Sequence, residues 1–147
     1  MTTERQFCTF FLDKLFFGVE VEKVQEVIRY QEMTRVPLSP PVVAGLINLR
    51  GQIVTAINLR QQLGLSAGAS ECRPMNVVIR REDGPVSLLV DEIGDVVKVD
   101  DQLFEHVPDT VDKERREFIR GVYKLKDKLL LLLDSEKAMT VTAAHLA

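Results

Sequence analysis

The chain has 147 residues, of which 46% are hydrophobic and 28% charged, and its formal net charge is −3 at pH 7. This composition excludes a largely disordered protein, and the slight acidic excess gives no electrostatic reason to expect binding to nucleic acid. No apolar run approaches the roughly 18 residues of a transmembrane helix, and Met1–Arg5 lacks the apolar core of a signal peptide. We therefore expect a cytoplasmic protein without direct membrane insertion, in which Cys8 and Cys72 are reduced.

Two short strand-like runs, over residues 6–12 and 15–19, open the chain on either side of a polar turn. This pattern predicts a hairpin. Apolar residues then recur at intervals of three and four over residues 21–28, which predicts a short helix. Such a helix would have only about two turns, so packing rather than propensity must hold it.

The most distinctive segment of the chain covers residues 45–58 and follows a proline-rich loop over 37–41. Two apolar stretches flank the pair Arg50-Gly51, and this pattern predicts a hairpin with Arg50 at its turn. We expect Gly51 to permit the turn and Gly45 to allow the close approach of another backbone. A helical turn over residues 59–63 is expected to follow.

The second half of the chain begins after residues 66–74, which are small and polar, as in a linker. Two strands are predicted around the turn Asp83-Gly84, because glycine accepts the positive φ of a tight turn. A helical turn is expected after Val111, followed by a hairpin over 121–134. Residues 134–139 predict a capped final helix.

The two halves resemble each other. The hairpin predicted over 121–134 echoes the one over 45–58, but without a counterpart of Arg50-Gly51, and residues 90–97 echo residues 21–28. Short strands, tight turns and few helices predict a mostly β fold: two SH3-like, five-stranded β-barrel lobes with a groove between them and a few short helices. Within this single domain, 1–147, we expect lobe 1 over about 6–65, a linker over about 66–74, lobe 2 over about 75–139, and a tail over 140–147.

The chain lacks the residue patterns that are typical of catalysis or of cofactor binding. Its histidines, His106 and His145, are far apart, and it has no zinc-protease, phosphate-loop, dinucleotide-binding or nucleophile-elbow motif. We therefore expect no enzyme activity, no metal and no cofactor. One group of acids matches no cation-binding loop and is interpreted as a solvated face: Asp91, Glu92, Asp95, Asp100, Asp101 and Glu105.

The run Gly45-Leu-Ile-Asn-Leu-Arg-Gly-Gln-Ile-Val, with the Asn58-Leu-Arg60 that closes it, resembles the CheW family of chemotaxis coupling proteins. The resemblance extends from about Phe7 to Met139, although residues 103–111 match poorly and Asn58 stands where the family often has aspartate. It implies a stand-alone, non-catalytic adaptor that joins the cytoplasmic hairpin tip of a chemoreceptor to the regulatory domain of the histidine kinase CheA. It also implies recruitment to membrane receptor arrays.

The resemblance further implies which residues bind the partners. Ile28 and Val36 are candidates for the kinase-facing edge of the first lobe. From the residue pattern alone, the valines and isoleucine of the receptor set could equally be core residues, and its arginine a solvated charge. The implied receptor-binding set lies around the groove between the lobes: Val24, Glu26, Gly45, Arg50, Gly51, Ile93 and Val96.

A function of another class remains open, namely a small-molecule-binding or enzymatic double β-barrel that uses the same groove. The two hypotheses differ in the site that they predict. A ligand-binding or enzymatic protein should have a closed pocket with convergent polar groups, whereas an adaptor should have an open apolar cleft with a polar rim.

Overall fold

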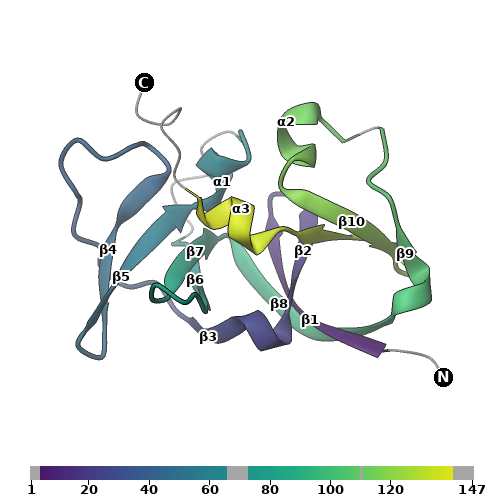
Figure 1. Ribbon diagram of the computed structural model, residues 1–147, viewed down its shortest axis with the longest axis horizontal. Helices are drawn as coiled ribbons and strands as arrows, with labels where there is room; N and C mark the ends of the chain where they lie inside the picture. Colours follow the sequence, from purple (N-terminus) through teal and green to yellow (C-terminus); the bar gives the residue numbers. More distant parts are fainter. Residues whose placement is uncertain (1–3, 66–72, 110, 141–147) are drawn as a thin grey trace.

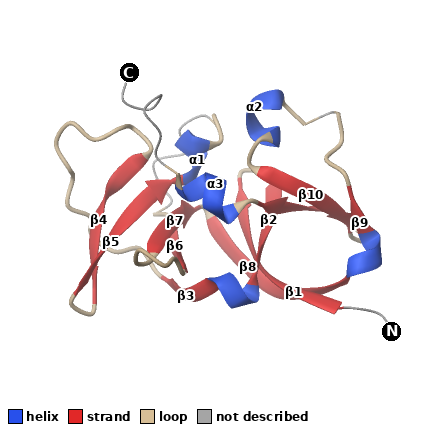
Figure 2. Ribbon diagram, in the orientation of Figure 1, coloured by secondary structure: helices blue, strands red, loops and turns tan. Residues whose placement is uncertain are grey.

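The computed structural model describes residues 4–65, 73–109 and 111–140, and in these residues it consists of two β-sheets with a few short helical segments. Figures 1 and 2 show the two sheets next to each other, with α3 (Ser135–Met139) at their junction. The predicted mostly β fold of two lobes with a few short helices is therefore confirmed.

One sheet has six strands, in the order β8-β1-β2-β11-β10-β9. The β1–β2 and β10–β11 hairpins are those predicted from the sequence, and β2 and β11 pair in parallel. The sheet has one strand more than predicted because the short β9 adds to β10. Its strands are β1 (Glu4–Leu12), β2 (Leu15–Glu20), β8 (Glu92–Asp100), β9 (Phe104–Glu105), β10 (Ile119–Lys124) and β11 (Leu129–Leu133).

The other sheet has five strands, in the order β3-β6-β7-β5-β4. The β4–β5 and β6–β7 hairpins confirm the two predicted from the sequence, and β5 pairs in parallel with β7. The strands are β3 (Val24–Ile28), β4 (Val43–Leu49), β5 (Gln52–Asn58), β6 (Met75–Ile79) and β7 (Val86–Val90).

Each sheet contains strands from both halves of the chain. The opening hairpin β1–β2 joins β8, β10 and β11, while the hairpin β6–β7 joins β3, β4 and β5. The internal repeat is present, but each copy contributes its first hairpin to the sheet of the other copy. The sheets therefore do not coincide with the expected lobes over 6–65 and 75–139. Most of the expected linker (66–72) and of the tail (141–147) lies outside the described residues.

In each sheet, the chain that leaves one edge strand returns to the strand at the opposite edge. In the five-stranded sheet the chain after β3 returns to β4, where Thr34 and Leu46 exchange backbone hydrogen bonds of 2.9 and 2.8 Å. In the six-stranded sheet the chain after β8 returns as β9 and pairs with β10. A glycine faces each crossing: a Cβ on Gly45 would lie 2.9 Å from the Thr34 carbonyl oxygen, and one on Gly121 would lie 2.8 Å from that of Glu105. The repeated glycine is thus required by close backbone approach, as predicted for Gly45.

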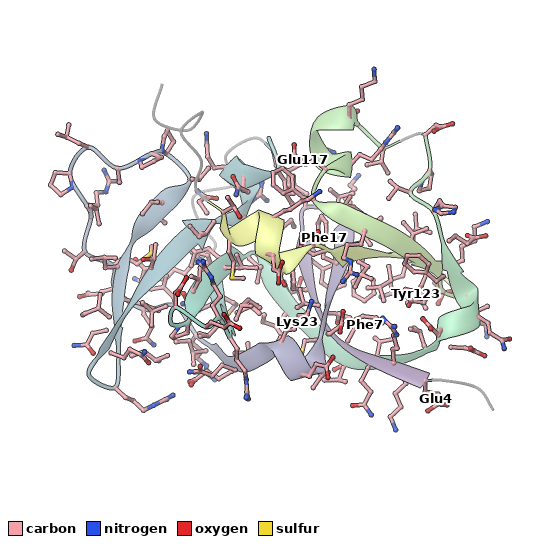
Figure 3. All side chains as sticks on the ribbon, viewed as in Figure 1. Glu4, Phe7, Phe17, Lys23, Glu117 and Tyr123 are labelled. Carbon is pink, nitrogen blue, oxygen red and sulfur yellow. The ribbon has the colours of Figure 1, made fainter. Side chains whose placement is uncertain are left out.

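Three apolar clusters hold the fold together. The largest joins the two sheets, and the other two lie on the opposite face of each sheet. Neighbouring residues of central strands point into different clusters: on β2, Phe17 faces the junction and Phe16 the other side, where Phe7 packs on Tyr123 (Figure 3). Because the central strands are buried on both faces, they appear in the sequence as continuous apolar runs.

The prediction of a helix over residues 21–28 is wrong. Only a single 3₁₀ turn, Val21–Lys23, precedes the strand β3, which pairs with β6. A β-bulge between Val24 and Glu26 inserts one extra residue, so that Val24 and Val27 lie on the same face although they are three residues apart. A bulged strand therefore reproduced the spacing of a helix, and the β-branched residues of the segment favour the strand.

Three short helices and a second 3₁₀ turn complete the fold. The predicted helical turns correspond to α1 (Leu59–Gln62) and α2 (Lys113–Arg116), and a 3₁₀ turn, Asp101–Leu103, leads into β9. The predicted final helix is α3, and the Asp134 side chain caps it by accepting a 3.2 Å hydrogen bond from the Lys137 amide. Asn58 caps α1 in the same way, so an amide at this position suffices for the cap.

Candidate functional site

Arg50 and Gly51 form the two-residue turn between β4 and β5. The flanking residues Leu49 and Gln52 pair directly, and both turn residues have positive φ, 52° and 89°. These values are typical of a type I′ turn, whose twist matches that of the flanking strands. The Asn48 side chain accepts a 2.8 Å hydrogen bond from the Gly51 amide. The sequence prediction of a turn with Arg50 at its tip is therefore confirmed.

The Arg50 guanidinium is paired with Glu26 on β3. Its Nη1 donates a 3.0 Å hydrogen bond to Oε1 of Glu26, and its Nη2 contacts Oε2. Because β3 and β4 are the two edges of the five-stranded sheet, this pair connects one edge with the hairpin at the other. The hydrogen bond from Arg50 lowers the pKa of Glu26, and the hydrogen bond to Glu26 raises the pKa of Arg50. Glu26 and Arg50, both in the receptor-binding set that the resemblance implies, are thus brought together.

Gly45 lies apart from the exposed surface. It is buried against Thr34, where the chain after β3 crosses β4. Gly45 contacts the protein's own backbone. It therefore allows the chain at Thr34 to cross β4, in the same sheet that carries Arg50 and Glu26. Gly51, in contrast, is exposed, with no atom near the position of a Cβ.

The apolar members of the predicted receptor set lie at the margin of the cluster that joins the sheets. Val24 is buried there, and Ile93 is partly buried against the same cluster. Val96 is 56% exposed and pairs across the strands with Cys8, which also packs against this cluster. Directly paired residues share a face of the sheet, so Val96 lies on the junction side. Figure 1 shows β3 and β8 at the lower side of the molecule, where the two sheets adjoin.

Val27 is a further candidate residue that the sequence analysis did not include. Val27 is 38% exposed and pairs with Val77, a member of the junction cluster. It is therefore a second exposed apolar residue at the edge of the junction cluster, next to the ion-paired Glu26 on the same strand. We call Val24, Val27, Ile93 and Val96 the junction margin. The only signal in the sequence was the apolar spacing of residues 21–28, which had been interpreted as a helix.

The two candidates for kinase contact lie in different structural elements. Ile28 is on the edge strand β3 and packs partly buried against the inner cluster of the five-stranded sheet. Val36 lies in the loop between β3 and β4, where its carbonyl accepts a 2.8 Å hydrogen bond from the Ser39 hydroxyl. Val36 also lines a hollow of about 630 Å³ together with residues of the same loop.

Arg60 forms an ion-pair network between the sheets that sequence reasoning did not find. Its Nε donates a 2.9 Å hydrogen bond to Asp91, and its Nη2 contacts both Asp91 and Asp13. The Asp13 amide donates a further 2.8 Å hydrogen bond to Asp91. Arg60 follows β5, Asp13 lies in the β1–β2 turn and Asp91 connects β7 to β8, so the network joins the two sheets.

The interpretation of Asp91 as one of the solvated acids is wrong, because its side chain is partly buried and paired with Arg60. Partial burial opposes its ionisation, but the hydrogen bonds from Arg60 and from the Asp13 amide outweigh burial and lower its pKa. Among the described residues, no cluster of three histidine, cysteine or acidic side chains is arranged to hold a metal ion.

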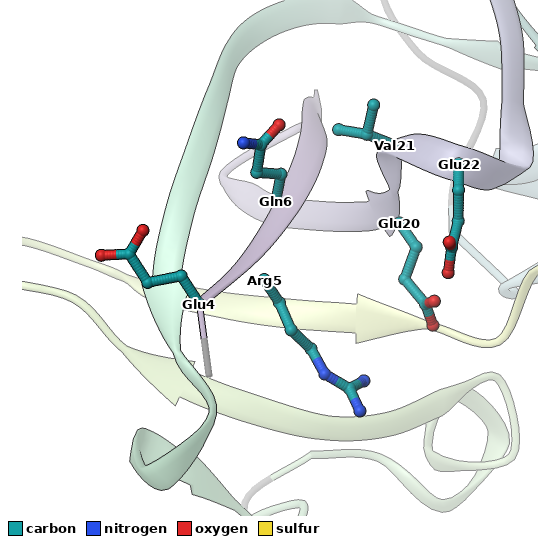
Figure 4. A pocket seen from close by; sticks show the side chains of 6 residues that line it. All are labelled: Glu4, Arg5, Gln6, Glu20, Val21 and Glu22. Atoms are coloured by element: carbon teal, nitrogen blue, oxygen red, sulfur yellow. The ribbon is translucent and has the colours of Figure 1, made fainter. Parts of the chain in front are cut away.

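A polar hollow lies at the start of β1. It has a volume of about 450 Å³ and combines three carboxylates with one guanidinium (Figure 4). One of the carboxylates is engaged within the protein, because Glu20 lies 3.7 Å from Lys23 and 3.6 Å from Arg120. The lining residues are Glu4, Arg5, Gln6, Glu20, Val21 and Glu22.

Residues 6–142 match the model of the CheW-like domain. The chain belongs to the CheW family. It is 27% identical to the probable chemotaxis protein CheW of Rhizobium etli, over 98% of this chain and 93% of that protein. It is 28% identical to the chemotaxis protein CheW of Bacillus subtilis, over 93% and 88% of the two chains.

A solved CheW structure shares the fold. The scaffolding protein TtCheW from Thermoanaerobacter tengcongensis has a TM-score of 0.80 to this chain, over 89% of each chain and at 24% sequence identity. The CheW resemblance predicted from the sequence is thus confirmed, and this CheW-like chain is an adaptor of chemotaxis signalling rather than an enzyme. In the described part of the chain, no helix combines the length and apolar character needed to cross a bilayer.

Proposed function

We propose that this CheW-like chain couples the cytoplasmic hairpin tips of chemoreceptors to the regulatory domain of the histidine kinase CheA. The observation that carries the proposal is that the edge strands β3 and β8 each expose an apolar residue of the junction margin, Val27 and Val96, and that the Glu26–Arg50 ion pair lies beside Val27. An apolar strip with a polar rim suits a helical partner. We further propose that the chain acts in the cytoplasm and is recruited to receptor arrays at the membrane.

The receptor face in this proposal is the junction margin with its polar rim. Val96 and Val27 offer exposed apolar contact area, while Val24 and Ile93 support them from the core. A receptor tip is a helical hairpin, and its apolar residues would cover this surface. The polar rim consists of Glu26, Arg50 and Gly51, with Gly45 behind it.

Arg50 can serve a partner without leaving Glu26. A guanidinium has five N–H donors, and the two contacts with Glu26 use two of them. The Arg50 side chain is 69% exposed, so the remaining donors can reach carboxylate or carbonyl oxygens on the receptor. The pairing with Glu26 holds the guanidinium in place, which reduces the entropy lost on binding.

The kinase face in this proposal includes Ile28 and Val36. Ile28 lies on the edge strand β3, and an edge strand offers unpaired backbone groups to a similar sheet in a partner. By holding receptor and kinase together, the adaptor raises the effective concentration of each near the other. Receptor signals can then alter kinase activity without chemistry in the adaptor itself.

Titration calorimetry tests this proposal with one variant and one matched control. Val96→Asp places a charge in the proposed receptor face, whereas Leu103→Asp changes an apolar residue of similar exposure, 51%, in the 3₁₀ turn after β8. We expect Val96→Asp to weaken binding of a receptor hairpin fragment at least tenfold and to leave binding of the CheA regulatory domain unchanged. Unchanged receptor binding by a folded Val96→Asp protein would refute the proposed receptor face.

A further inference from the structure

A pocket of about 350 Å³ lies between α2 and the six-stranded sheet, away from both the junction margin and the Arg50 turn. Its walls come from the end of β1, the β1–β2 turn and the start of β2 on one side, and from β10, β11 and the α2 segment on the other. We call it the α2 pocket. Its lining residues are Phe11, Lys14, Leu15, Phe16, Val111, Asp112, Arg115, Ile119, Lys128, Leu129 and Leu131.

The floor of the α2 pocket is apolar. The buried Ile119 and Leu131 and the partly buried Leu129 belong to the junction cluster, and Phe11 and Phe16, from the cluster on the other face of the sheet, complete the apolar lining. The pocket volume is near the lower end of the range of about 300–1,000 Å³ that is typical of small-molecule sites. An occupant that covers this floor must therefore have a small apolar body.

The rim of the α2 pocket is positively charged, although the whole chain carries a formal net charge of −3. The lining includes three cations, Lys14, Arg115 and Lys128, and one carboxylate, Asp112, so its formal charge is 3 − 1 = +2. Asp112 lies 3.7 Å from Arg115. Within the described residues, neither lysine forms an ion pair, which leaves two cations available to a ligand.

Lys128 is exposed and lies over two aromatic rings of the pocket lining. Its Nζ lies 4.5 Å from the ring centroid of Phe16 and 5.4 Å from that of Phe11, which are cation–π distances. This places a positive charge directly beside the apolar surface. A ligand whose anionic head is attached to an apolar body would satisfy both parts of the pocket at once.

We propose that the α2 pocket binds a small anionic amphiphile, a carboxylate on an apolar body of the size of a medium-chain acyl group. The apolar body covers the floor of Ile119, Leu129 and Leu131, and the carboxylate lies between Lys14, Arg115 and Lys128. Because the pocket shares no residue with the proposed receptor and kinase faces, this binding is separate from the adaptor function and holds whether or not that function does.

The test is titration of the full chain with decanoate below its micelle concentration, followed by calorimetry and by the methyl NMR signals of Ile119, Leu129 and Leu131. We expect saturable binding that shifts these signals. Decanol, which has the same apolar body without the charge, should bind more weakly, and added salt should weaken decanoate more than decanol.

The matched variants are Lys128→Gln, in the pocket rim, and Lys126→Gln, an exposed lysine two residues away that does not line the pocket. We expect Lys128→Gln to raise the Kd of decanoate about two- to fivefold and Lys126→Gln to leave it unchanged. The proposal is overturned if decanoate does not saturate, if decanol binds equally well, if the two variants behave alike, or if the shifted signals lie outside the α2 pocket.

Discussion

The Arg60 network offers a quantitative test of how the two sheets are joined. Replacing Asp91 with asparagine keeps the size of the side chain but removes the charge that Arg60 contacts through both Nε and Nη2. The Arg60 and Asp91 side chains are only 14% and 30% exposed, so solvent screens them incompletely. Loss of a charged hydrogen-bond partner at such a site costs about 1–3 kcal/mol. A loss of about 2 kcal/mol corresponds to a decrease in Tm of roughly 4–8 °C for a domain of this size.

The same network predicts how stability depends on pH. Its interactions lower the pKa of Asp91 in the folded protein, relative to the ordinary value of about 3.9 in an unfolded chain. The stabilisation is therefore fully present above the unfolded pKa and is lost as the pH falls through the folded pKa. The stability difference between the wild type and Asp91→Asn should be constant from pH 7 to about pH 5 and should shrink at more acidic pH.

Urea unfolding followed by circular dichroism measures both effects. Asp95→Asn is the matched control, because Asp95 is an exposed acid on β8, four residues from Asp91. We expect the control to change the free energy of unfolding by less than about 0.5 kcal/mol. Equal stability of the two variants, or a stability difference for Asp91→Asn that persists below the pKa of Asp91, would refute the role assigned to the network.

Three further predictions concern the turn and the exchanged hairpins. Gly45→Val should lower Tm measurably in thermal unfolding, because a Cβ would meet the Thr34 carbonyl oxygen at 2.9 Å, whereas Gly51→Ala, at an open turn position, should lower it less; equal effects would contradict this reading. Arg50→Glu should weaken receptor binding in calorimetry, and it should lower thermal stability because it places two carboxylates together. Adding Glu26→Arg should restore thermal stability without restoring receptor binding. Full recovery of binding in the double variant would show that only the ion pair matters, not the position of the arginine. A fragment of residues 1–65 should lack native circular dichroism alone and regain it when mixed with residues 66–147, because β1–β2 belongs to the sheet of the second half; independent folding of either fragment would contradict the exchange.

The sequence predicted much of the local structure. The Arg50-Gly51 turn follows from glycine between two apolar runs, and the cap at Asp134 follows from a side chain that accepts an amide hydrogen bond. The segment over 21–28 was misread because a bulge after Val24 changes the period of a strand from two to three. Periodicity alone does not separate this case from a short helix.

The candidate site was predicted only in part, for a related reason. Glu26 and Arg50, both in the implied receptor-binding set, do meet, and Val96 is exposed at the edge of the junction; whether they bind a receptor stays a prediction. Arg60 and Asp91 were missed because their pairing depends on how β5 and β7 are placed, not on any local motif. Charged residues that are distant in the sequence carry no local sign that they will meet.

The sequence by itself determined most of the strands, the tight turns, the internal repeat and the membership of the CheW family, because each of these depends on local patterns of residues or on a motif of neighbouring positions. Only the tertiary structure decided that each copy of the repeat gives its first hairpin to the other sheet. The hairpins β1–β2 and β6–β7 are apolar on both faces, so their residues alone do not determine which of the two sheets each hairpin joins. The choice is made by the parallel pairing of β2 with β11 and of β5 with β7, and by the apolar cluster that this pairing buries between the sheets.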